Sequence, residues 1–384
     1  MLILLLSGCG LFHALSEPPM VDDTGPLTTD TDSGMTETGT DTGTDTDTDT
    51  DTDTDTGTVI LPLDMALYTM VIKSNNIQID TFNLLDGTMV NTIQTEMTGN
   101  TNRKNAFIIT HDQMLMATGN TDSFLYGFNI DDNTGLLQAT SWSPLHTESS
   151  MFALANSLDL VYGLADTYVE VFEYNTADVD VFSSYDVCED FCFLYDIAAK
   201  KGRDGFVAIY SNVSDDQYSF VTGNSLVEEL AGADLSFYGP AAPTSLVSYG
   251  NQGLAYAPAE TSISAIGTDN KITLFNTWDA EDFRDLAFSP DNSMVYAINR
   301  AGELFSYRVL QQGLQWEDGM MNSAPERSRH IFASEQFLAI SSTESVWVYE
   351  LDSSGRPNNL IHQINVNGNG QFGPIVIVEG VSGN

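Results

Sequence analysis

Positive charge is scarce in this sequence. Only 13 Lys and Arg stand against 54 Asp and Glu, so the net charge is −41 over 384 residues. A surface of this sign repels phosphate backbones and anionic lipid head groups. The charge balance therefore excludes nucleic acid as a partner, and it favours a soluble domain that its own charge keeps monomeric.

Long hydrophobic runs are missing as well. No stretch of about 20 apolar residues is present, so the sequence predicts no membrane-spanning helix. Nothing matches a phosphate loop, a dinucleotide fingerprint or a nucleophile elbow, and no three His are placed to hold zinc. We therefore predict no cofactor and no metal centre, with only loose binding of divalent cations by the many carboxylates.

Cysteine is rare, with three in the whole chain. Cys188 and Cys192 stand close together, with three residues between them. In an exported protein such a pair favours a structural disulfide. Two free thiols and a redox pair are the alternatives, although a thioredoxin-like redox motif has two intervening residues.

The third cysteine belongs to the motif Leu6-Ser7-Gly8-Cys9, which follows a short apolar run. This motif resembles the bacterial lipobox, in which a large apolar residue and two small residues precede the lipidated cysteine. The resemblance implies that 1–9 is a lipoprotein signal remnant with its lipid on Cys9, and Gly10 after the cysteine implies the outer membrane. The protein would then be a periplasmic or surface-exposed part of the cell envelope, held to the membrane only through the lipid anchor.

Residues 10–59 form a segment rich in Thr and Asp, with an almost unbroken Asp-Thr repeat from Asp41 to Thr58. Such a segment has too little apolar surface to offset the entropy of ordering the chain. It also lacks the Gly and Glu positions of an EF-hand loop. We predict a disordered linker that acts as a spacer.

The remainder, 60–384, has the texture of β-sheet, with short runs of Val, Ile, Phe and Tyr between turn residues. A unit of strand, turn, strand, turn, long strand and edge strand recurs about every 45 residues. Its clearest copy begins at Arg284-Asp285-Leu286-Ala287-Phe288-Ser289-Pro290-Asp291-Asn292. Six complete units can be counted, and strands without a complete unit are left over at 66–95 and 374–379.

The two leftover segments predict how the units close. If 374–379 supplies the first strand that 66–95 lacks, the units number seven and no open sheet edge remains at the ends. We therefore predict an all-β, seven-bladed β-propeller over 60–384, closed by pairing of its N- and C-terminal strands. Two β-sandwiches or a β-helix are the alternatives, but neither predicts incomplete units at opposite ends.

Several motifs support a family resemblance. Ser328-Arg329-His330-Ile331-Phe332, the segment from Val346 to Gly355 and the segment from Tyr126 to Gly135 are similar to motifs of the seven-bladed lactonase-type propellers. This family includes the bacterial 6-phosphogluconolactonases. The resemblance implies a propeller fold and, as one functional hypothesis, hydrolysis of a lactone. The His that this family tends to carry in a middle blade is absent from 192–210.

The few cations of the chain concentrate where the blades of a propeller would meet. The connections from fourth to first strands gather at one mouth of the ring, and three of them contain Arg103-Lys104, Arg284-Asp285 and Arg329-His330. Arg binds carboxylate or phosphate bidentately, so these six residues predict an anion-binding mouth. Alternatively, each Arg pairs with a carboxylate such as Asp285. In a hydrolase, His330 would be the base, and Arg329 with Arg284 would polarise the carbonyl oxygen.

Together these features predict a surface-anchored lipoprotein that presents a β-propeller to a protein or a glycan, without catalysis. The alternative is a lactone hydrolase that resembles 6-phosphogluconolactonase.

Overall fold

A computed structural model describes part of the chain. The described residues are 65–74, 76–95, 106–110, 113–117, 124–131, 134–147, 151–157, 159–165, 167–175, 178–187, 192–199, 204–212, 218–223, 247–249, 254–258, 262–266, 272–276, 283–299, 301–310, 313–316, 322–366 and 370–379. They belong to the second of two units of the chain, Val59–Asn384. The predicted signal remnant (1–9) and linker (10–59) lie outside them and stay predictions.

The described part of the chain consists of β-strands and contains no helix that could cross a membrane. Its strands form seven antiparallel sheets, which we number as blades 1 to 7. Blade 1 contains β29 (Gln371–Glu379), β1 (Met65–Ile72), β2 (Ile77–Asn83) and β3 (Met89–Gln94). Blade 2 contains β4 (Phe107–Thr110), β5 (Gln113–Ala117), β6 (Phe124–Ile130) and β7 (Leu137–Ala139), and β8 (Leu145–His146) pairs with β6.

The next two blades follow in chain order. Blade 3 contains β9 (Met151–Ser157), β10 (Leu160–Ala165), β11 (Tyr168–Asn175) and β12 (Asp178–Asp186). Blade 4 contains β13 (Cys192–Ala199), β14 (Phe206–Asn212) and β15 (Tyr218–Gly223).

Three further blades complete the set. Blade 5 contains β16 (Val247–Tyr249), β17 (Leu254–Pro258), β18 (Ser262–Ile266) and β19 (Ile272–Asn276). Blade 6 contains β20 (Phe283–Phe288), β21 (Met294–Asn299), β22 (Glu303–Leu310) and β23 (Gly313–Trp316), and β24 (Asn322–Ser323) pairs with β22. Blade 7 contains β25 (His330–Ala333), β26 (Phe337–Ser341), β27 (Ser345–Leu351) and β28 (Pro357–Asn365).

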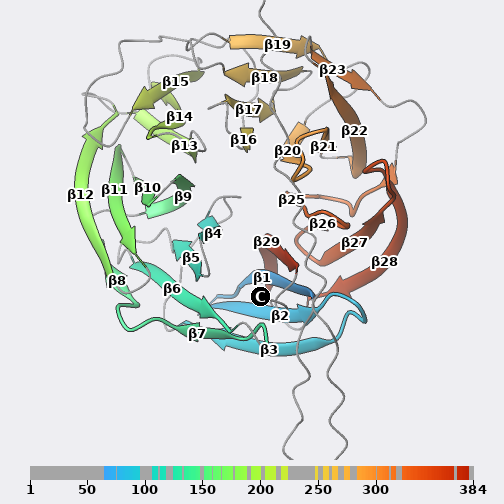
Figure 1. Cartoon of the computed structure of the whole chain (residues 1–384), viewed down its shortest axis with the longest axis horizontal. Helices are drawn as coiled ribbons and strands as arrows, with labels where there is room; N and C mark the ends of the chain where they lie inside the picture. Colours follow the sequence, from blue (N-terminus) through green and yellow to red (C-terminus); the bar gives the residue numbers. More distant parts are fainter. Residues whose placement is uncertain are drawn as a thin grey trace, which may run out of the picture. The chain divides into compact units, whose positions relative to one another are not determined.

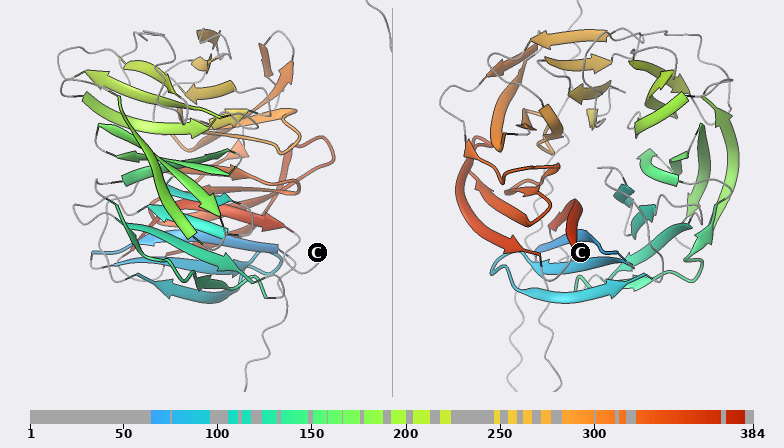
Figure 2. Two further views of the ribbon diagram at one scale, coloured as in Figure 1. Left: turned by 60° about the vertical axis from the view of Figure 1, so that its left-hand side comes forward. Right: turned by 180° about the vertical axis from the view of Figure 1, so that it is seen from behind.

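The sheets follow one another around a central axis, with the first strand of each blade innermost (Figures 1 and 2). Five of them, blades 2, 3, 5, 6 and 7, are complete blades in which four consecutive strands run from the inside to the outside. Blade 4 has three described strands, and 224–246, which follow β15, lie outside the described residues. This arrangement confirms the propeller that the sequence predicts.

Blade 1 closes the ring because it combines the two ends of the described chain. The C-terminal strand β29 pairs antiparallel with β1, and the register sets Ala66 opposite Val378 and Tyr68 opposite Val376. The strand is apolar on both faces because it lies between two neighbours. Val376 packs in a cluster with residues of blade 2, whereas Ile377 packs with residues of blade 7. A continuous apolar run of this kind is typical of a strand that is buried on both sides.

Two turns between third and fourth strands are built on an Asp and a Gly. Gly135 and Gly355 have φ values of +66° and +77°, which a glycine adopts without steric cost. The backbone N–H of each glycine donates to the carbonyl of the Asp that begins its turn, Asp131 or Asp352. Hydrogen bonds from the side chain of Ser354 and from turn amides hold the pKa of Asp352 below its usual value.

These turns also join neighbouring blades. The Tyr68 hydroxyl of blade 1 donates to the carbonyl of Gly135 in blade 2 at 2.6 Å. The Tyr296 hydroxyl of blade 6 donates in the same way to Gly355 of blade 7 at 2.5 Å. Burial raises the pKa of both phenols well above the usual value. We call this contact, from a second strand to the outer turn of the next blade, the tyrosine clasp.

The tyrosine clasp predicts that removal of one hydroxyl group lowers the stability of the protein. Tyr296→Phe leaves the half-buried carbonyl of Gly355 without this donor, so we expect the free energy of unfolding to fall by about 1 kcal/mol. Tyr307→Phe in the same blade is the matched control, because its hydroxyl is buried and has no hydrogen-bond partner among the described residues. Urea unfolding should show little change for this control. Equal losses in the two variants would contradict a specific role for the clasp.

Candidate ligand-binding site

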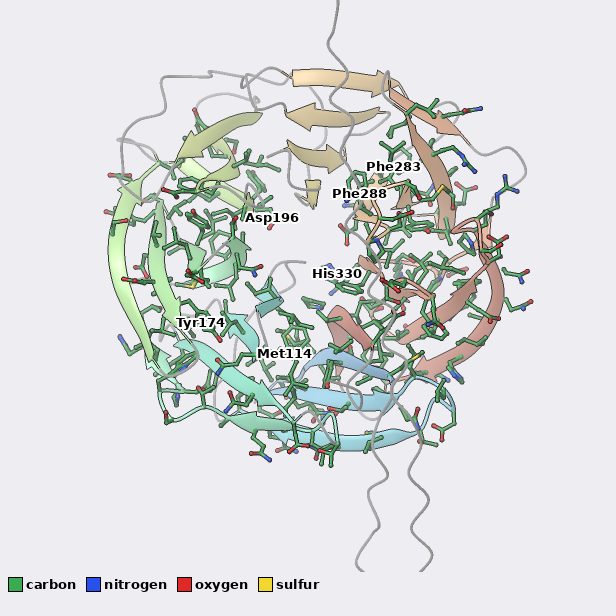
Figure 3. All side chains as sticks on the ribbon, viewed as in Figure 1. Met114, Tyr174, Asp196, Phe283, Phe288 and His330 are labelled. Atoms are coloured by element: carbon green, nitrogen blue, oxygen red, sulfur yellow. The ribbon has the colours of Figure 1, made fainter. Side chains whose placement is uncertain are left out.

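The inner strands of blades 6 and 7 carry four of the six residues predicted for the mouth. Arg284 and Asp285 lie on β20, His330 begins β25, and Arg329 directly precedes it. The other two, Arg103 and Lys104, lie outside the described residues. Figure 3 shows His330 near the centre of the ring. The structure thus places Arg284 and Asp285 on one inner strand, and Arg329 and His330 at the start of the inner strand of the next blade.

Asp285 and His330 occupy equivalent positions. The amide of Ser289 donates to Met294 across the first turn of blade 6, and the amide of Ser334 donates to Phe337 across the first turn of blade 7. Four residues before each of these serines stand Asp285 and His330. Both are buried, with 0% and 5% of their surface exposed. Two buried polar side chains thus occupy the same position on the inner strands of two consecutive blades.

The carboxylate of Asp285 connects the two blades. Its Oδ1 accepts the backbone amide of Leu286 at 2.8 Å, and its Oδ2 accepts the amide of Ile331 in blade 7 at 2.9 Å. Hydrogen bonds to an ionised acceptor are stronger than those between neutral groups. Because each oxygen already accepts a main-chain amide, Asp285 acts as a structural joint, and it fixes the strand that begins with His330.

Arg329 lies at the junction of blade 7 with the closing strand β29. Its backbone amide donates to Ser341 at 2.8 Å, and its Nη1 donates to Oε1 of Gln371 at 3.4 Å. The side chain is half-buried, and burial lowers the pKa of the guanidinium. A partly desolvated guanidinium attracts an anion more strongly than one in bulk water. Arg284 is also half-buried, on the adjacent blade.

Two further polar residues of inner strands were not predicted from the sequence. Asp196 on β13 is fully buried, and it follows an irregularity in strand pairing like the one before Asp285. Figure 3 shows it on the inner side of blade 4. The shared pattern of Asp, an aliphatic residue and Ala (Asp196-Ile197-Ala198 and Asp285-Leu286-Ala287) was the available signal. Gln371, by contrast, carries no local motif that would indicate its contact with Arg329.

Other candidate residues stand apart from this mouth. Cys192 is buried and disulfide-bonded, and Cys188 lies outside the described residues, so the bond between these two stays a prediction. In the described ranges, no three His, Cys, Asp or Glu are grouped so that they could hold a metal ion.

Comparison with known proteins supports the fold. No family model and no curated protein matches this sequence. Among solved structures, a protein from Bacteroides fragilis provisionally assigned as a 6-phosphogluconolactonase aligns with a TM-score of 0.61 and 16% identity, covering 83% of this chain and 98% of its own. A second such protein, from Bacteroides uniformis, gives a TM-score of 0.63 and 14% identity, with 82% and 100% covered.

A protein of unknown function from Desulfotomaculum acetoxidans is also similar, with a TM-score of 0.55, 15% identity, and 81% and 99% of the two chains covered. The neighbours are thus β-propellers of the 6-phosphogluconolactonase-like type. At these identities the likeness concerns the fold, and the chemistry of the mouth has to be argued from its own residues.

The joint at Asp285 predicts a loss of stability on neutralisation. Asp285→Asn replaces one acceptor oxygen by an amide group that cannot accept from a main-chain N–H, so we expect a loss of about 1.5–3 kcal/mol in the free energy of unfolding. Glu350→Gln, on an exposed position of β27, is the matched control and should change little. Urea unfolding of both variants measures the difference. An Asp285→Asn protein as stable as the wild type would rule out the joint.

Proposed function

We propose that this protein is a surface-anchored lipoprotein whose β-propeller binds a glycan or protein through a carboxylate group of that ligand. The observation that carries this proposal is the double main-chain contact of Asp285. The carboxylate of Asp285, on the inner strand next to the one that His330 begins, accepts the amides of Leu286 and Ile331. It therefore serves the fold, and we infer that Arg284, Arg329 and His330 contact the ligand.

The residues of the mouth suit an anion better than a neutral sugar. Arg284 and Arg329 come from adjacent blades, and the fork of a guanidinium matches the two oxygens of a carboxylate. The chain has a charge of −41, so the rest of the surface repels anions. A local positive site therefore directs an anionic ligand to the mouth. Sugar acids and acidic side chains of proteins both offer this group.

Lactone hydrolysis is the second candidate function, and the fold likeness to the two Bacteroides proteins favours it. In that case, His330 would take a proton from water, and Arg329 with Arg284 would stabilise the oxyanion on the former carbonyl. The product of such a reaction is itself a sugar acid. The two functions therefore share a ligand chemistry and differ in turnover.

Titration calorimetry with gluconate, glucuronate and neutral glucose tests whether the protein binds sugars through a carboxylate. We expect both acids to bind and glucose not to bind, because only the acids offer a carboxylate. Arg329→Gln should weaken binding of both acids at least about tenfold, because it removes one charge-assisted hydrogen bond. Arg308→Gln, on the third strand of blade 6, is the control. Equal affinity for gluconate and glucose would contradict the proposal.

The same proteins decide between binding and catalysis. Hydrolysis of gluconolactone above the spontaneous rate, reduced in Arg329→Gln and retained in Arg308→Gln, would establish the hydrolase instead. Rates equal to the spontaneous rate in all three proteins would leave binding as the function.

The anchor is a separate part of the proposal, and it is supported by the motif that ends at Cys9. We expect cells fed labelled palmitate to incorporate label into the wild-type protein and not into Cys9→Ser, because the thiol is the acceptor of the lipid. Fractionation should place the labelled protein in the outer membrane. Label in the Cys9→Ser protein would refute this anchor while leaving the ligand-binding test unaffected.

A further inference from the structure

An exposed aromatic side chain lies at the start of β13, the innermost strand of blade 4. Phe193 is 59% exposed, the largest fraction among the large apolar side chains that the structure describes. The residue before it, Cys192, is buried and disulfide-bonded. The strand is therefore covalently restrained at the point where it presents Phe193. One exposed apolar side chain is common on a protein surface, so its meaning depends on its neighbours.

Two hydroxyl groups lie beside Phe193 on the same blade. The register sets Phe193 directly opposite Ser211 on β14, and side chains that are directly opposite in an antiparallel pair share one face of the sheet. The hydroxyl oxygens of Tyr195 and Ser211 are 3.2 Å apart, within hydrogen-bonding distance. Both aromatic side chains therefore adjoin Ser211. We call Phe193, Tyr195 and Ser211 the aromatic platform.

The aromatic platform lies at the same end of the inner strands as the two Arg of the mouth. The strand pairing shifts register at Tyr195 on β13 as it does at Arg284 on β20, so these two residues occupy equivalent positions. Arg329 holds the same position in blade 7, because it stands directly before His330, the equivalent of Asp285. Figure 1 shows β13, β20 and β25 as the innermost strands of their blades. The mouth is thus aromatic on blade 4 and cationic on blades 6 and 7.

Side chains at this position reach the solvent. Tyr195, Arg284 and Arg329 are all half-buried, whereas the residue that follows each of them is buried, with at most 5% of its surface exposed. Phe193 precedes Tyr195 by two residues and lies still closer to the end of its strand. A ligand at the mouth therefore meets the aromatic platform and the two Arg before it meets the buried residues below them.

The aromatic platform has the chemistry of a sugar-binding surface. A sugar ring has C–H groups on its faces, which pack on an aromatic ring, and hydroxyl groups at its edge, which need hydrogen-bond partners. Phe193 offers the ring, and the hydroxyls of Tyr195 and Ser211 both donate and accept, as those of a sugar do. Ligand sites commonly combine aromatic side chains with a few polar groups in this way.

We propose that the aromatic platform is a second subsite of the mouth and that the ligand is an acidic oligosaccharide. The inference rests on the proposed function for the sugar that carries the carboxylate, which binds at Arg284 and Arg329. It adds a further sugar of the same ligand, which stacks on Phe193. Blade 5 lies between blade 4 and blade 6 in the ring, so the ligand has to extend along the mouth past blade 5. It therefore contains more than one sugar.

Titration calorimetry of the full chain with galacturonate and its linear trimer tests the second subsite. We expect the trimer to bind about threefold to tenfold more tightly than the monomer, because only the trimer reaches Phe193. Phe193→Ala should remove this gain and leave the affinity for the monomer unchanged. Phe193→Leu keeps an apolar side chain without the flat ring, so it should also lose most of the gain. Leu85 is 58% exposed in the turn between β2 and β3, and Leu85→Ala is the matched control that keeps the gain.

The possible results separate this inference from the proposed function. If monomer and trimer bind equally tightly, or if Phe193→Ala keeps the gain, the second subsite is wrong while the carboxylate site stands. If neither acid binds but a neutral trimer of galactose binds through Phe193, the platform stands and the carboxylate site is wrong. Triglutamate that binds as tightly as the trimer, with the same sensitivity to Phe193→Ala, would assign the platform to a peptide. No binding of any of these ligands would refute both subsites.

Discussion

The pairing of β29 with β1 is the constraint on which the rest of the structure depends. Six of the seven blades are built from strands that are close in sequence, but blade 1 needs both ends of the described chain. Once it forms, every blade has two neighbours, and the apolar faces of β29 are covered by blade 2 on one side and blade 7 on the other. Within this ring, the inner strands β20 and β25 are joined by the hydrogen bond from the amide of Ile331 to Asp285.

Polar contacts between blades add specificity to this apolar packing. Hydrophobic burial is not directional, so on its own it would allow adjacent blades to slide. The clasps of Tyr68 and Tyr296 fix the outer part of two blade pairs, and the joint at Asp285 fixes the inner part of one. The mouth therefore combines the side chains of Arg284, Arg329 and His330 with an acid that joins the two strands beside them.

The fold could be predicted from the period of the sequence, and the candidate site only in part. The repeat of about 45 residues and the apolar segment at the C-terminal end were enough for the propeller and its closure, since both signals are local and repeated. The turns at Gly135 and Gly355 were also predictable, because an Asp three or four residues before a Gly is typical of a turn. Asp285 was predicted as a ligand-binding or rim residue, but its role depends on the amide of Ile331 in the next blade. Asp196 was missed because its signal is a short motif shared with one other blade and not a period, and Gln371 because its contact with Arg329 joins residues that are far apart in the sequence.

Closure through β29 also has a consequence for how the chain reaches its folded state. Met65 and Glu379 pair at one end of the closing sheet, although about 300 residues separate them, so this contact has a very high sequence separation and forms slowly. Until the last strand has been synthesised, β1 keeps an exposed apolar edge, which invites pairing with another chain. The species that form before β29 pairs with β1 are therefore the ones most prone to aggregate.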